Sequence, residues 1–135
     1  MTFTLPNGEV YIAFRGTDTT VTGWREDFNL SFLKETPGQQ AAARYLTDTA
    51  KRTDGPIVTG GHSKGGNLAV YAAAFAEPFA RERVVAVCSN DGPGFNSKVA
   101  DSPEYVAIIP KVRLFLPESS LVGILMANQI GRAHV

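Results

Sequence analysis

One serine, Ser63, lies between glycines at the point where an apolar run meets an alanine-rich run, in the stretch VTGGHSKGGNLAVYAAAF. The residues Gly61 to Gly65 fit the pattern G-x-S-x-G, in which a sharp strand-to-helix turn lifts a serine hydroxyl above the edge of a sheet. Bulky side chains would collide in so tight a turn, and this explains the glycines. The pattern therefore predicts a nucleophile, and the chemistry it favours is acyl transfer.

The start of the helix after Ser63 offers help for such a reaction. A helix N-terminus is the positive end of the helix dipole, and the backbone N–H of Lys64 lies there, where it can stabilise an oxyanion. A glycine-rich turn of this kind also suits phosphate binding or a purely structural role. The apolar strand before the turn, and the small residues after it, favour the nucleophile.

Two carboxylates occupy the positions at which a catalytic acid can follow a nucleophilic serine. Asp91, in SNDGPGF, comes after the next predicted strand, and Glu118, in LPESS, comes after the strand that follows it. We favour Asp91, because a short carboxylate in a loop rich in glycine and proline is easily aimed, whereas PESS also resembles a helix N-cap. A simple turn-forming role remains an alternative for Asp91.

The general base is the missing part of this set. The sequence has two histidines, and His62 adjoins Ser63, where neighbouring side chains diverge. His134 has the expected chain order, serine then acid then histidine. It belongs, however, to residues 130–135, IGRAHV, which match the translation of a common sequencing adapter. We interpret that segment as an artefactual tail and expect the catalytic histidine to be missing from this chain.

The elements that must position these residues alternate along the chain. The sequence predicts a hairpin of strands around a Pro6-Asn7-Gly8 turn, and then helices that alternate with nearly continuous apolar strands. The strands are expected at 3–5, 9–14, 56–60, 83–90 and 111–117, and the helices at 37–52, 64–77, 102–110 and 119–129. Thr36 is the expected N-cap of the first helix, with Pro37 in its first turn. This alternation predicts an α/β fold with a mostly parallel sheet and helices on both faces.

Composition limits the classes of partner and cofactor. The chain has 135 residues, 44% of them hydrophobic, and a formal net charge of zero, so we expect one soluble domain and no nucleic-acid partner. The single cysteine, Cys88, excludes a disulfide within the chain and a cysteine-based metal site. We expect no metal and no cofactor. No signal peptide and no transmembrane segment is recognisable, so the expected location is the cytoplasm.

Taken together, the segments AFRGTD and GGHSKGGNLA resemble the fungal-type (class 3) lipase family of α/β hydrolases. With GWREDFNLSF, SNDGPGF and PESSLVG added, the chain is more similar to a bacterial lipase-like group catalogued as a domain of unknown function. The resemblance implies that Ser63 is the nucleophile and that Thr17 and Lys64 donate their backbone N–H groups to the oxyanion. It also implies a substrate that is a small-molecule or lipid ester.

We therefore expect residues 1–129 to form a partial α/β-hydrolase domain, incomplete at both ends, followed by the tail at 130–135. The predicted function is that of a lipase- or esterase-like serine hydrolase, acting through an acyl-enzyme on Ser63. A non-catalytic binding module is an alternative if the histidine is also missing from the parent protein. An acyltransferase or thioesterase could use the same turn. The residues do not indicate an oligomeric state.

Overall fold

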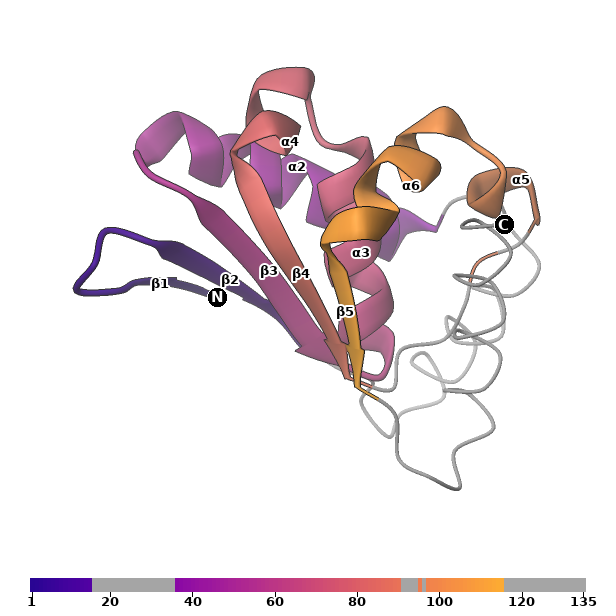
Figure 1. Cartoon of the computed structure of the whole chain (residues 1–135), viewed down its shortest axis with the longest axis horizontal. Helices are drawn as coiled ribbons and strands as arrows, with labels where there is room; N and C mark the ends of the chain where they lie inside the picture. The colour runs from indigo at the N-terminus through magenta and orange to yellow at the C-terminus, as the bar shows by residue number, and fades with distance from the viewer. Residues whose placement is uncertain (16–35, 91–94, 96, 116–135) are drawn as a thin grey trace.

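The computed structural model describes residues 1–15, 36–90, 95 and 97–115, and these form a five-stranded sheet with helices (Figure 1). Its strands are β1 (Thr2–Thr4), β2 (Val10–Phe14), β3 (Ile57–His62), β4 (Val84–Asn90) and β5 (Val112–Phe115). They lie side by side in the order β1-β2-β3-β4-β5. The β1–β2 pair is antiparallel and the other pairs are parallel, so the predicted hairpin and mostly parallel α/β sheet are confirmed.

Helices connect the parallel strands. They are α2 (Pro37–Arg52), α3 (Lys64–Phe75), α4 (Pro78–Arg83), α5 (Ser97–Ala100), α6 (Pro103–Ile108) and the 3₁₀ helix η1 (Ile109–Lys111). Helices α4 and α5 have no counterpart among the predicted elements, because helices of six and four residues are too short to show a periodic pattern. The helix expected at 119–129 lies outside the described residues.

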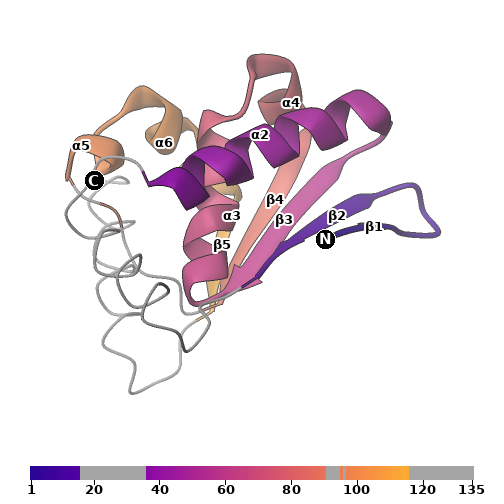
Figure 2. The same cartoon turned by 180° about the vertical axis from the view of Figure 1, so that it is seen from behind.

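The described helices α2, α3, α4 and α6 gather on one face of the sheet (Figure 2). This follows from the strand order, because successive right-handed crossovers that advance in one direction place their helices on the same side. The opposite face carries Phe3 and Phe115, which are 47% and 53% exposed. Within the described ranges, the expected covering of helices is therefore observed on one face of the sheet. Among the helices in the described ranges, none is both long enough and hydrophobic enough to cross a bilayer.

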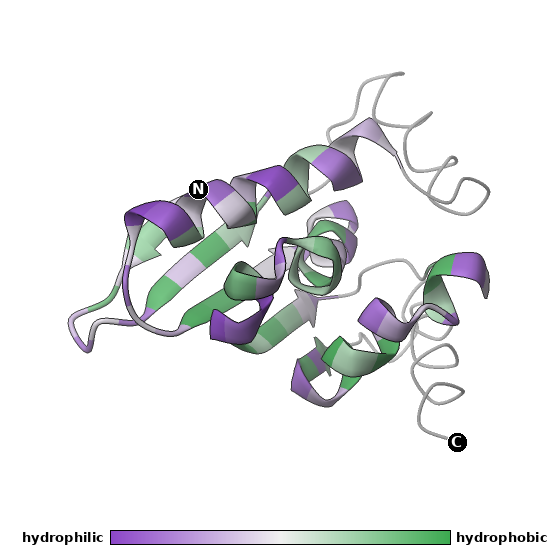
Figure 3. Cartoon of the chain, turned by 90° about the horizontal axis from the view of Figure 1, so that it is seen from above, coloured by the Kyte–Doolittle hydropathy of each residue, from purple (hydrophilic) through white to green (hydrophobic). Residues whose placement is uncertain are grey.

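Helix α3 is the centre of the core. Its residues from Gly65 to Ala74 are all buried, because the helix packs on β3 and β4 and is flanked by α2 and α6. Helix α2 is instead amphipathic, with hydrophobic and hydrophilic residues alternating around it (Figure 3). It buries Ala42 and Leu46. The helix that begins directly after Ser63 is thus held on several sides.

Candidate active site

Ser63 joins the end of β3 to the start of α3 with an unusual backbone conformation. Its φ is 54° and its ψ is −124°, and it is the one non-glycine residue with positive φ in the described part of the chain. Such a conformation costs of order 1–3 kcal/mol and persists only where the surroundings impose it. The N–H of Ser63 donates to the carbonyl of Asn90 (2.8 Å), and its own carbonyl accepts from the N–H of Gly66 (2.9 Å).

The two flanking glycines are required by close backbone contacts. A Cβ atom on Gly61 would lie 2.4 Å from the carbonyl group of Gly65, and one on Gly65 would lie 2.3 Å from the carbonyl oxygen of Phe14. Real Cβ atoms do not approach other atoms so closely. The first turn of α3 therefore rests directly on the ends of β2 and β3, and this confirms the steric reason for the glycines given above.

Gly65→Ala is expected to lower the free energy of unfolding by about 3 kcal/mol, because the added methyl group must push the start of α3 away from β2. Gly8→Ala is the matched control: Gly8 has a φ of 87° but no atom within 4 Å of the added Cβ. Conformational strain alone should cost that variant about 1 kcal/mol. Denaturant unfolding of both variants tests the prediction, and equal losses would contradict the steric explanation.

Three other predicted site residues follow, in the sequence, strands that end at this edge of the sheet. Thr17, Asp91 and Glu118 lie outside the described residues. The strands that lead to them end beside Ser63: Phe14 pairs with Gly61, and Asn90 pairs with both His62 and Phe115. The sheet thus brings the carboxyl ends of β2, β3, β4 and β5 together, which is where open α/β sheets bind their ligands.

The described histidine lies beside Ser63 in the chain but points elsewhere. Successive side chains of a strand point to opposite faces. Gly61 faces α3, so His62 faces the other side of the sheet, where it is exposed. Lys64 is the first residue of α3 and is partly buried. Across the described ranges there is no group of three or more His, Cys, Asp or Glu side chains that could hold a metal ion.

A buried polar network that was not predicted from the sequence links α2 to α3, the helix that follows Ser63. Thr36 caps α2: its hydroxyl accepts from the N–H of Gln39 (3.1 Å), and the Gln39 side-chain oxygen accepts from the N–H of Thr36 (3.0 Å). The Gln39 amide Nε2 donates to Oδ1 of Asn67 (2.9 Å). The predicted N-cap is confirmed, and the T-x-x-Q spacing of a capping box could also have identified Gln39.

Tyr11 lies across the face of the sheet that α3 does not cover. A Cβ atom on Gly60 would lie 2.0 Å from the Tyr11 hydroxyl, so the phenol ring can occupy this place only over a glycine. Burial, and to a smaller extent the nearby Cys88 thiol, raise the pKa of the Tyr11 hydroxyl above its ordinary value of 10.0. Tyr11 therefore stays neutral at physiological pH and serves as a packing residue here.

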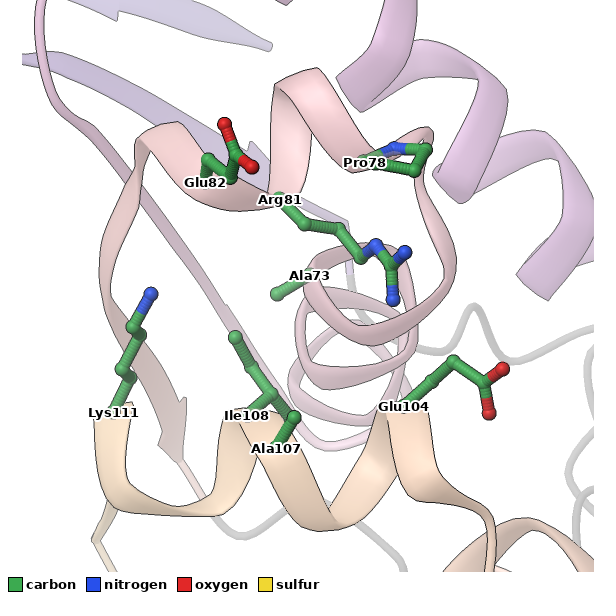
Figure 4. A pocket seen from close by; sticks show the side chains of 8 residues that line it. All are labelled: Ala73, Pro78, Arg81, Glu82, Glu104, Ala107, Ile108 and Lys111. Atoms are coloured by element: carbon green, nitrogen blue, oxygen red, sulfur yellow. The ribbon is translucent and has the colours of Figure 1, made fainter.

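A separate cavity of about 230 Å³ lies between α3, α4 and α6 (Figure 4). Ala73, Ala107 and Ile108 form its apolar wall, with Arg81 and Glu104 beside them. Its lining comes from the end of α3 and from the segments that precede β4 and β5. It therefore lies at the edge of the sheet opposite Ser63, and we do not include it in the candidate site.

A mostly parallel sheet with a serine held at positive φ, between a strand and the helix packed on that sheet, defines an α/β protein with a sharp, strained strand-to-helix turn. The chain belongs to the Mbeg1-like family, whose model matches residues 1–135. A search of curated proteins found no match to the chain.

Proposed function

We propose that the protein is a serine hydrolase in which the Ser63 hydroxyl attacks an ester carbonyl and the resulting acyl-enzyme is hydrolysed by water. The observation that carries this proposal is the backbone of Ser63, held at φ 54° between β3 and α3. Backbone strain of this kind is concentrated at functional sites. A serine with only a structural role would gain nothing from a conformation that glycine adopts without strain.

Within this proposal, the oxyanion that forms at the attacked carbonyl accepts from the backbone N–H groups of Thr17 and Lys64. Lys64 opens α3, so its N–H lies at the positive end of the helix dipole. Its partner, Thr17, follows the end of β2, the strand on which the Ser63 turn rests. The substrate class, a small-molecule or lipid ester, is proposed from the family resemblance of the sequence motifs.

Asp91 is the proposed acid of the set, with Glu118 as its alternative. The backbone carbonyl of Asn90, the residue before Asp91, accepts a hydrogen bond from the N–H of Ser63. Strand β4 therefore ends directly beside the turn that carries the proposed nucleophile. Glu118 follows β5, which lies one strand farther from β3. We assign the base to neither histidine of the sequence, because His62 faces the other side of the sheet and His134 lies in the segment interpreted as a tail.

A fluorophosphonate probe tests the proposal, because it phosphonylates activated serines and leaves ordinary ones untouched. Incubated with the full-length protein, it should label the peptide that contains Ser63, as read by mass spectrometry after digestion. Prior heat denaturation should abolish the label. Labelling of a different serine, or no labelling of a folded full-length protein, would contradict the assignment of Ser63.

A further inference from the structure

The pair Gln39–Asn67 is a buried polar link between α2 and α3. The exposed fractions of Gln39 and Asn67 are 2% and 0%, so their 2.9 Å hydrogen bond is shielded from water. Asn67 stands one helical turn after Ser63, and its N–H approaches the carbonyl of Ser63 at 3.3 Å. The link therefore connects the first turn of α2 with the turn that carries the proposed nucleophile.

Buried hydrogen bonds hold α3 to its neighbours: Gln39–Asn67 joins it to α2, and the Thr59 hydroxyl of β3 donates to the carbonyl of Ala69 (3.1 Å). The helix is rich in alanine, with Ala69, Ala72, Ala73 and Ala74 all buried, and such small side chains form low ridges. Contacts of this kind are non-directional, so they favour one register less sharply than a directional bond does. A buried hydrogen bond is directional and is costly to leave unmade, so it favours one register over its neighbours.

We propose that Gln39 and Asn67 are positioning residues for Ser63: their hydrogen bond sets the register of α3 against α2 and so fixes the nucleophile turn. The inference deepens the function proposed above and rests on it. In this proposal, neither side chain touches the reacting atoms. Their effect passes through the backbone of the first turn of α3, whose other supports are the Gly65 contact with β2 and the Ser63–Asn90 hydrogen bond.

The test compares Gln39→Met, Asn67→Leu and the double variant, each of similar side-chain size, in the full-length protein. Both single variants should lose stability, and Gln39→Met should lose more because it also removes the acceptor of the Thr36 N–H; the double variant should lose less than the sum of the two. Turnover should not recover: kcat of the double variant should stay about 10-fold below wild type, with KM within about twofold, because a slightly misplaced nucleophile slows chemistry. Gln40→Met, an exposed neighbouring change on α2, is the control.

A second measurement does not depend on activity. The Gly66 amide, bonded to the Ser63 carbonyl, should exchange with solvent about 10-fold faster in the double variant, while the amides of β3 keep their protection. Wild-type kcat together with wild-type Gly66 exchange in a stable double variant would overturn the inference. If no protein shows Ser63-dependent turnover, the proposed function fails, and Gly66 exchange alone then decides for or against the register role.

Discussion

Ser63→Ala in the full-length protein is expected to lower turnover of a short-chain nitrophenyl ester by about 10⁶-fold. The physical reason is that the covalent route through an acyl-enzyme disappears with the hydroxyl. Oxyanion donors and binding contacts remain, and they should keep the variant about 10³–10⁴-fold faster than the reaction without enzyme. Initial rates from purified wild type and variant, at matched concentrations of folded protein, measure the effect.

Ser63→Gly separates loss of chemistry from loss of fold. Glycine adopts φ 54° without strain, so the free energy of unfolding of this variant should be about 1 kcal/mol higher than that of wild type. The variant should nevertheless be inactive. Ser97→Ala, an exposed change at the start of α5, should leave both properties unchanged. A Ser63→Ala or Ser63→Gly variant that keeps wild-type turnover would show that the activity belongs to another residue.

Asp91→Asn is expected to lower turnover by about 10⁴-fold, because an amide in place of the carboxylate stabilises the wrong tautomer of the catalytic histidine. The loss should appear in kcat, with KM little changed, since the acid acts on the base and does not hold the substrate. Labelling of Ser63 by the fluorophosphonate probe should slow by a similar factor. Stopped assays over a long time course measure rates this low.

Glu118→Gln is the matched control for that change, because it removes the alternative carboxylate in the same chemical way. Its turnover should remain within about threefold of wild type if Asp91 is the acid. The reverse ranking would assign the role to Glu118. Equal and small effects of both changes would contradict any triad built on these two carboxylates.

Local patterns in the sequence identified those parts of the fold that short-range forces control. The Pro6-Asn7-Gly8 turn, the Thr36 cap and the G-x-S-x-G run each depend on backbone sterics within a few residues. The structure confirms the hairpin, the cap and the strand-to-helix turn at Ser63. The helices α4 and α5 were missed, because segments this short lack a periodic signal and are stabilised by packing on the rest of the domain.

The candidate site divides in the same way. The turn at Ser63 could be predicted, because glycines and serine at fixed spacing encode a strand-to-helix turn that few other sequences need; the role of Ser63 as nucleophile stays a prediction. The roles of Thr17, Asp91 and Glu118 stay predictions, since these residues lie outside the described ranges. Gln39 could not be connected to Asn67 from the sequence: they are 28 residues apart, and nothing local relates the first turns of two helices.

By itself the sequence determined that the protein is an α/β fold with a serine in a glycine-flanked turn between strand and helix. The tertiary structure alone decided the strand order, the gathering of the described helices on one face, the positive φ of Ser63 and the partner of Asn67. The physical reason is range. Periodicity and turn chemistry act between near neighbours, whereas register and strain arise from contacts between segments that only the folded chain brings together.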